Sequence, residues 1–144
     1  MADSFDLSAS QEDYMEVIFH ITEEKKVARA KEIAGQLKVS RASVTEALKG
    51  LGKKKLIHYA PYEVITLTSK GRLAALDVVR RHKALKDFFT KVLAVDEDLA
   101  DQGACQIEHA APPEIIERLA AFMEFLEGSG QSGNMLLREF ARSV

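Results

Sequence analysis

The chain has 144 residues, of which 47% are hydrophobic, and it carries one cysteine and a formal net charge of −2. This length can bury an ordinary core as one domain or as two small lobes, without a disulfide or a structural metal. The single cysteine, the lack of an apolar stretch of about 18 residues and the lack of a charged-then-apolar leader predict a soluble, cytoplasmic protein with no membrane partner.

The small net charge conceals two regions of opposite sign. Between residues 25 and 55, lysine and arginine far outnumber the acidic residues Glu32 and Glu46, whereas residues 96 to 127 hold nine acidic residues against Arg118 alone. A basic footprint attracts the phosphates of nucleic acids, and an acidic region attracts cations and repels DNA. Two regions of opposite charge are more often ordinary solvent-exposed helical faces than binding surfaces. The predicted helices and strands must therefore distinguish the two interpretations.

The first predicted helix spans Ser8 to Lys25. Ser8 or Ser10 can cap it, and apolar residues from Tyr14 to Ile21 recur at helical spacing, which predicts one buried face. Asp13 and Glu16, three residues apart, share another face that this packing does not need.

A helix-turn-helix is predicted next. Apolar residues from Ala30 to Leu37 form a short amphipathic helix, the pattern breaks at Lys38, and it resumes at Val44 behind Ser40, a good N-cap residue. Such a turn usually favours glycine, and a left-handed lysine at position 38 would cost about 1 kcal/mol.

Two short strands, Leu56 to Tyr59 and Val64 to Leu67, flank a turn at Ala60-Pro61-Tyr62 and predict a β-hairpin. A hairpin that follows a helix-turn-helix is a wing, so residues 8 to 68 predict a winged helix whose basic excess lies on the turn and the recognition helix. Glu46 could accept a hydrogen bond from cytosine or pair with Lys49 or Lys53. The predicted groove or backbone contacts are Ser40, Arg41, Ser43 and Thr45, with Arg29 and Lys49 on phosphate.

The second half of the sequence predicts a helical lobe. A long helix from Thr68 to about Ala94 could link the DNA-binding head to a partner subunit, and an acidic helix follows from Asp96 to His109. Pro112 and Pro113 stop that helix and start another, and the glycine- and serine-rich run 128–133 predicts a flexible linker to a short terminal segment.

The acidic helix holds Cys105, Glu108 and His109 at positions i, i+3 and i+4, so a thiolate, a carboxylate and an imidazole share one face. Together they could bind a transition metal. The alternative is a small buried cysteine beside solvent-facing Glu108 and His109.

Taken together, these segments resemble the metal-dependent repressors of the diphtheria toxin repressor and manganese transport regulator family. The resemblance covers residues 8 to 128. It rests on Glu12-Asp13-Tyr14-Met15-Glu16, Ser40-Arg41-Ala42-Ser43-Val44-Thr45, Leu67-Thr68-Ser69-Lys70-Gly71, Arg81-His82 and Cys105-Gln106-Ile107-Glu108-His109. It implies a metal site built from Asp13, Glu16, His82, Cys105, Glu108 and His109.

The implied ligand set mixes two chemistries. Carboxylates and imidazoles with one thiolate suit divalent transition metals and poorly suit Mg²⁺ or Ca²⁺. In the resemblance, cysteine marks the iron branch, and the acids at Asp13 and Glu16 mark the manganese branch. We therefore expect Fe(II), with Mn(II) next.

We expect a mainly α-helical protein with a small β-hairpin wing. A winged helix-turn-helix over residues 1–71 would bind DNA, a helical domain over residues 72–128 would bind metal and dimerise, and residues 129–144 would form the linker and C-terminal segment. The chain would be a homodimeric, metal-activated repressor that binds double-stranded operator DNA and controls iron or manganese homeostasis. The alternatives are a winged-helix regulator that responds to a small organic ligand or to oxidation of Cys105, and a metallohydrolase, for which the sequence offers no separate general base.

Overall fold

The computed structural model describes residues 5–60 and 64–144. The chain divides into two compact units, residues 1–79 and 80–144, and helix α4 (Ser69–Asp87) begins in the first unit and ends in the second. Within the described residues, no helix is long and apolar enough to cross a membrane.

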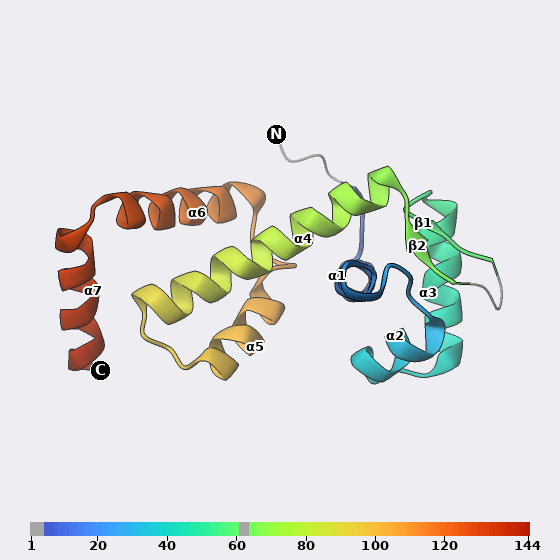
Figure 1. The fold of residues 1–144 in the computed structure, drawn as a ribbon, viewed down its shortest axis with the longest axis horizontal. Helices are drawn as coiled ribbons and strands as arrows, with labels where there is room; N and C mark the ends of the chain where they lie inside the picture. The colour runs from blue at the N-terminus through green and yellow to red at the C-terminus, as the bar shows by residue number, and fades with distance from the viewer. Residues whose placement is uncertain (1–4, 61–63) are drawn as a thin grey trace. The chain divides into compact units, whose positions relative to one another are not determined.

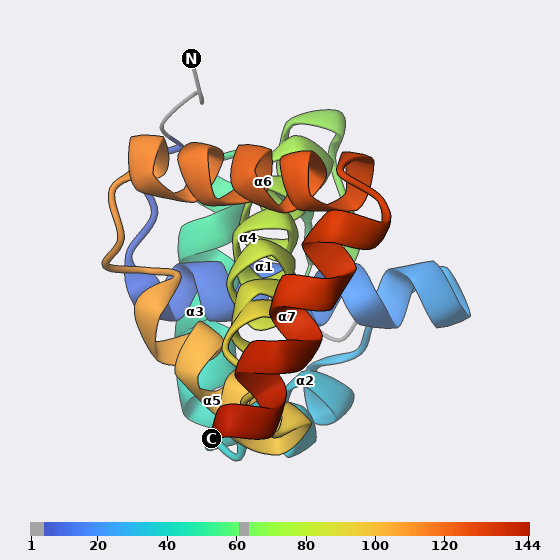
Figure 2. The ribbon, with the colours of Figure 1, turned by 90° about the vertical axis from the view of Figure 1, so that its left-hand side faces the viewer.

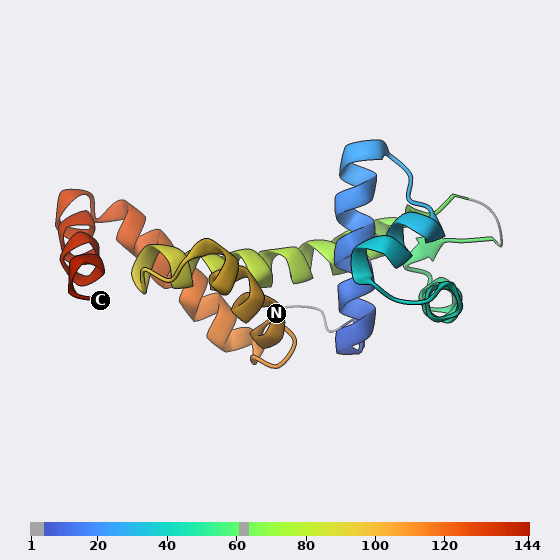
Figure 3. The same cartoon turned by 90° about the horizontal axis from the view of Figure 1, so that it is seen from below.

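The first unit is a winged helix-turn-helix, as the sequence predicts. Three helices, α1 (Ala9–Lys25), α2 (Ala30–Leu37) and α3 (Arg41–Lys53), precede an antiparallel hairpin of β1 (Ile57–His58) and β2 (Thr66–Leu67). Figures 1 and 3 show α3 beside the hairpin, with α1 and α2 to the left of α3 and in contact with it. Pro61 and Tyr62 of the predicted turn lie outside the described residues, and Ile65 extends the sheet through a bridge to Ala28.

The core of the first unit explains this arrangement. Apolar side chains from the three helices and from Ile65, just before β2, meet in it with no solvent exposure, among them Met15, Ile33 and Leu48, and Ile57 of β1 is also buried. Burying an aliphatic side chain of this kind contributes roughly 1.5–3 kcal/mol. One such cluster therefore fixes the positions of the three helices and the hairpin relative to one another.

Local signals set the ends of these helices. The Ser8 and Ser40 hydroxyls accept hydrogen bonds from the backbone N–H groups of Gln11 and Ser43, both at 3.1 Å, so both predicted N-caps are confirmed. Lys38 takes the left-handed conformation (φ 55°, ψ 45°) that the turn requires. At the start of α4, a Cβ atom on Gly71 would collide with the Leu56 carbonyl, which explains the glycine after the wing.

The second unit is helical throughout its regular structure. After the second half of α4 come the π-helical turn η1 (Phe88–Val92), α5 (Glu97–Ile107) and α6 (Pro113–Gly128), whose buried contacts centre on Leu85, Ala104 and Ile116. The predicted long helix therefore changes to π-helical bonding near its end, where the Leu93 N–H donates to the Phe88 carbonyl. It ends at Val92, and Ala94, two residues further on, takes a φ of 56°.

The C-terminal segment differs from the sequence prediction. Instead of a flexible linker, only Ser129 and Gly130 separate α6 from helix α7 (Gln131–Ser143), and Figure 2 shows α7 turning away from α6 at that point. The Ser129 hydroxyl donates to the Leu126 carbonyl, and Gly130 makes the turn with a φ of 62°. Gly133 is buried at the corner, where a side chain would meet Ser129 and Leu126. The glycines therefore shape a tight helix–helix corner.

Candidate metal centre and nucleic-acid interface

The recognition helix α3 presents its N-terminal residues to solvent. Val44, Leu48 and Leu51 are fully buried, which directs Arg41, Ser43 and Lys49 away from the core. Arg29, at the N-cap position of α2, is also exposed. This surface combines cationic side chains with hydroxyl groups, the chemistry that binds phosphate and base edges.

Three of the predicted DNA contacts also bond within the helix. The Ser40 hydroxyl donates to the Ser43 hydroxyl at 3.0 Å, and the Thr45 hydroxyl donates to the Arg41 carbonyl at 3.0 Å. Lys49 lies 3.5 Å from Glu46, so the structure contains the ion pair that the sequence offered as one role for Glu46. Both partners are more than half exposed, so the pair contributes little to stability.

In the second unit, α4 and α5 bring three metal-binding groups together. His82 Nδ1 lies 2.7 Å from Glu108 Oε2 and 3.7 Å from Cys105 Sγ. One donor atom from each of these three residues can be chosen so that all lie within 4.8 Å of one another. An imidazole, a thiolate and a carboxylate at this spacing fit a divalent transition metal.

The burial of these groups argues against the simpler interpretation of the sequence. Cys105 is exposed, whereas Glu108 is completely buried, the reverse of a buried thiol beside a solvated acid. Glu108 Oε1 accepts no hydrogen bond from the described residues, and His109 Nε2 lies 3.4 Å from it. A buried carboxylate is costly unless it is paired or coordinates a cation, so this environment suits a ligand.

A second layer of contacts surrounds His82. Its Nε2 lies 2.8 Å from Asp101 Oδ1, and Lys86 Nζ lies 3.3 Å from the same oxygen. The hydrogen bond with His82 lowers the pKa of the Asp101 carboxyl below its ordinary value, and Lys86 adds to this effect. The hydrogen bond with Asp101 in turn raises the pKa of Lys86. Sequence reasoning missed Asp101 as a partner of His82, since it is one acid among many in an acidic helix.

The two remaining implied ligands lie in the first unit. Asp13 and Glu16 stand three residues apart on α1, and both are partly buried. Glu16 Oε1 lies 3.9 Å from His20 Nε2. His20 and His58, which the sequence leaves without a functional role, are both exposed.

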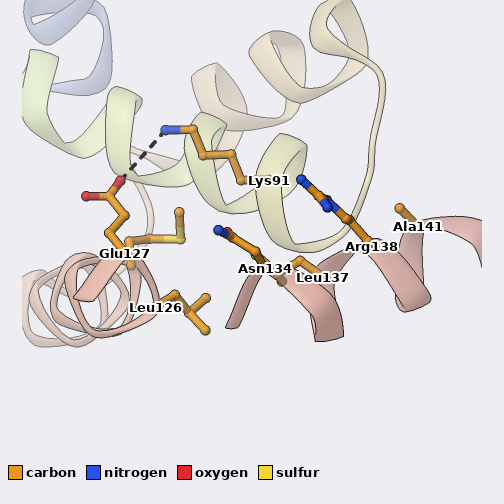
Figure 4. Close-up of a pocket in the computed structure, with 8 residues that line it drawn as sticks. Lys91, Leu126, Glu127, Asn134, Leu137, Arg138 and Ala141 are labelled. Carbon is orange, nitrogen blue, oxygen red and sulfur yellow. Dashed lines mark ion pairs between the residues drawn. The ribbon is translucent and has the colours of Figure 1, made fainter. Parts of the chain in front are cut away.

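A separate hollow in the second unit has different chemistry. It lies between η1, α6 and α7 and is lined by Lys91, Met123, Leu126, Glu127, Asn134, Leu137, Arg138 and Ala141 (Figure 4). Its single carboxylate, on Glu127, lies 3.9 Å from Lys91 Nζ. This lining includes no histidine or cysteine, so it lacks the donors found around His82.

Comparison with known proteins agrees with a DNA-binding surface in the first unit and a metal site in the second. Residues 6–65 match the iron-dependent repressor N-terminal DNA-binding domain, and residues 68–135 match the iron-dependent repressor metal-binding and dimerisation domain. The chain belongs to the iron-dependent repressor family. It is therefore a metal-responsive, DNA-binding transcriptional repressor and not an enzyme, as the sequence predicts.

Individual relatives of this repressor extend the comparison. It is 40% identical over 119 residues to an uncharacterised helix-turn-helix transcriptional regulator of Methanocaldococcus jannaschii. The matched region covers 82% of this chain and 95% of the relative. It is 35% identical over 118 residues to the regulator MntR of Bacillus subtilis, covering 82% of each. The solved structure of a manganese-dependent transcriptional repressor in complex with manganese has a TM-score of 0.73 and 30% identity, over 80% of this chain and 53% of that one. The repressor thus spans about half the length of that solved chain.

Family membership confirms several predictions from the sequence. These are the winged helix-turn-helix with a helical dimerisation domain, binding of a divalent metal and of DNA, and association as a homodimer.

Proposed function

We propose that this repressor binds a double-stranded, pseudo-palindromic operator in the cytoplasm when a divalent metal occupies the site around His82. The convergence of His82, Cys105 and Glu108 is the observation that carries the proposal, since these groups come from two different helices. Asp13, Glu16 and His109 complete the proposed set of metal ligands, because they match the ligand positions of the family. Residues 1–71 bind DNA, and residues 72–128 bind metal and form the dimer.

The donor set supports Fe(II) as the preferred metal, with Mn(II) next. The thiolate of Cys105 favours the softer Fe(II), while the carboxylates of Asp13, Glu16 and Glu108 suit Mn(II) as well. The similar solved structure, a manganese-dependent repressor in complex with manganese, supports the second metal. Control of iron or manganese homeostasis follows from either choice.

In the proposed mechanism, each of the two units contributes some of the residues that bind the metal. A bound metal supplies positive charge and directed bonds for the carboxylates, imidazoles and thiolate. Asp13 and Glu16 on α1 would hold this metal together with the ligands of the second unit, and that shared coordination would limit the orientations that the winged helix can adopt. At about 100 times its dissociation constant, a ligand stabilises the competent state by roughly 2.7 kcal/mol, about a hundredfold in population.

On the DNA-binding unit, the recognition helix supplies the operator contacts. Arg41 and the hydroxyls of Ser40, Ser43 and Thr45 face the groove or the adjoining backbone, and Arg29 and Lys49 bind phosphate. The Thr45 and Ser40 hydroxyls donate to their intrahelical partners, and each oxygen still has a lone pair that can accept a hydrogen bond from DNA.

Operator binding in metal-buffered solution tests the proposal. Purified protein is titrated onto candidate operator DNA first with chelator and then with Fe(II), Mn(II) or Zn(II) at controlled free concentrations. We expect metal to raise DNA affinity and Fe(II) to act at the lowest free concentration. Equal affinity with chelator and with every metal would contradict the metal-activated mechanism.

A further inference from the structure

The hollow between η1, α6 and α7 is a concave surface of the second unit that the proposed metal site does not use. Its volume is about 400 Å³, and its lining shares no residue with the proposed ligand set. Pockets that bind small molecules have volumes of about 300–1,000 Å³ and combine mostly apolar walls with a few polar groups. The hollow is therefore large enough to hold a small organic molecule.

Local contacts hold the three walls of the hollow in place. At the corner between α6 and α7, the Ser129 hydroxyl donates to the Leu126 carbonyl at 2.7 Å, and Gly133 packs where a side chain would not fit. Helix α7 also contacts η1, and π-helical turns of this kind occur often at functional sites. The hollow is therefore largely pre-formed, as small-molecule sites usually are.

Apolar side chains make up half of the lining. Met123 is buried, Leu126 and Leu137 are partly buried, and Ala141 leaves space on α7 because its side chain is a single methyl group. A hydrocarbon chain placed against these groups leaves water, which favours binding. These walls therefore suit a ligand with an apolar body.

The charged residues of the lining give the hollow a net positive charge. Lys91 and Arg138 are cationic and Glu127 is the one acid, so two positive charges and one negative charge leave +1. Lys91 Nζ lies 3.9 Å from Glu127 Oε1, whereas Arg138 forms no ion pair within the part of the chain that the structure describes. Figure 4 shows Arg138 and Asn134 extending from α7 toward η1. The guanidinium group is therefore available to an anion from solution.

This charge distribution favours a carboxylate with one negative charge. A guanidinium group can donate two parallel hydrogen bonds to a carboxylate, and the Asn134 amide offers a further N–H donor. Glu127 would repel a second negative charge on the ligand. Charge and apolar surface thus select the same class of molecule, a monoanion that carries a hydrocarbon group.

We propose that the hollow between η1, α6 and α7 binds a small organic monoanion, with its carboxylate on Arg138 and its apolar body against Leu126 and Leu137. This site is separate from the metal centre. It adds a second ligand to the repressor, and its occupation requires neither metal nor DNA.

Octanoate is a suitable probe because it combines one carboxylate with an apolar chain. It is titrated into the nitrogen-15-labelled 144-residue chain in the presence of chelator, and binding is followed by NMR. We expect saturable shifts of the amide signals of Leu126, Leu137 and Ala141. Octanol, which lacks the charge, and inorganic phosphate, which lacks the chain, should each bind more weakly by about tenfold or more.

Two pairs of variants locate the ligand. Arg138→Gln should weaken octanoate binding by roughly tenfold or more, because it removes a charged hydrogen-bond donor. Its matched control, Arg142→Gln, removes the same charge one turn further along α7, outside the hollow. Ala141→Phe fills the hollow and should abolish binding, whereas Ala121→Phe places the same ring at an exposed position of α6 outside the lining and should retain it.

Several results would overturn the proposal. Shifts that are absent at Leu126 and Leu137, or that spread without saturation over other exposed apolar residues, would show that octanoate does not occupy the hollow. Unchanged binding in Ala141→Phe would show the same. Equal affinity for octanoate and octanol, or equal affinity in Arg138→Gln and Arg142→Gln, would remove the recognition of charge. Phosphate that binds as tightly as octanoate would replace the organic monoanion with an inorganic one.

Discussion

Cys105 is the residue in the proposed ligand set that best discriminates between metals. It is the only sulfur ligand in that set, and it is exposed beside His82. We predict that Cys105→Ser lowers affinity for Fe(II) and Zn(II) by about tenfold or more, roughly 1.4 kcal/mol, and affinity for Mn(II) by less, because a thiolate favours softer ions. Competition with a chelating dye measures all three affinities.

Cobalt spectroscopy provides an independent check on the same residue. A Co(II)-bound thiolate gives a sulfur-to-metal charge-transfer band, which Cys105→Ser should abolish while the weaker ligand-field bands persist. The matched control, Ser132→Ala, changes a hydroxyl residue in α7 outside the proposed site. A charge-transfer band that survives in Cys105→Ser would remove the thiolate from the ligand set.

Substitution of Arg41, also a single residue, tests the proposed DNA-binding surface. It is the first residue of α3, and its side chain is exposed beside the Ser40 cap. We predict that Arg41→Ala costs roughly 1–3 kcal/mol of operator affinity if it reads a base, and lowers the salt slope by about one if it binds phosphate. Fluorescence anisotropy with operator DNA at several salt concentrations distinguishes these contacts.

The control for Arg41 is Arg142→Ala, which removes an exposed arginine from α7 in the other unit. We expect it to leave operator affinity within about 0.5 kcal/mol of wild type, the usual range for surface substitutions. If Arg41→Ala and Arg142→Ala bind operator equally well, Arg41 is not a DNA contact.

The sequence predicted the proposed metal ligands Cys105, Glu108 and His109, but not the contacts that Asp101 and Lys86 make around His82. The spacing of Cys105, Glu108 and His109 could be read from a helical pattern, but their unequal burial could not, because it depends on where α4 packs against α5. Asp101 and Lys86 resemble ordinary surface charges in the sequence. Their contacts form between α4 and α5, which no local pattern indicates.

At the scale of whole elements, the N-cap of α3 can be tested separately from DNA binding. The Ser40 hydroxyl accepts from the Ser43 N–H, and losing such a cap typically costs about 1 kcal/mol. We predict that Ser40→Ala lowers the free energy of unfolding by this amount in urea titrations followed by circular dichroism. Ser10→Ala, in the first turn of α1, should change it by less than about 0.5 kcal/mol. Equal unfolding free energies for the two variants would show that the cap contributes nothing.

The success of sequence prediction also varied between elements. Ser8, Ser40 and Asp96 mark helix starts through a local chemical rule, and the structure places all three as N-caps. Helix α7 was missed because Gly128 and Gly130 signal a break, and the corner that they form lets a new helix begin at once. The π-helical turn at residues 88–92 has no comparable sequence signal, since it reflects a change in hydrogen-bond register within an otherwise continuous helical pattern.

For the whole molecule, the exposed apolar residues of the second unit point to its partner. Leu99, Ile115, Phe125, Met135 and Leu136 are each more than half exposed. A helical unit that exposes large apolar side chains on several helices is typical of an interface. This exposure agrees with the match of residues 68–135 to a metal-binding and dimerisation domain.

The strongest test of communication between the units uses Asp13. If Asp13 is a ligand, Asp13→Ala should weaken metal binding and reduce the metal-dependent gain in operator affinity, while DNA binding without metal stays unchanged. The control is Glu24→Ala, which removes an exposed acid near the end of the same helix. Operator binding at a series of buffered Mn(II) concentrations measures both the affinity and the concentration that produces it. A regulator that responds to oxidation of Cys105 would instead lose its response in Cys105→Ser and retain it in Asp13→Ala. Asp13 belongs to the first unit and Cys105 to the second. Asp13→Ala therefore distinguishes a metal site with ligands from both units from a sensor that uses residues of the second unit alone.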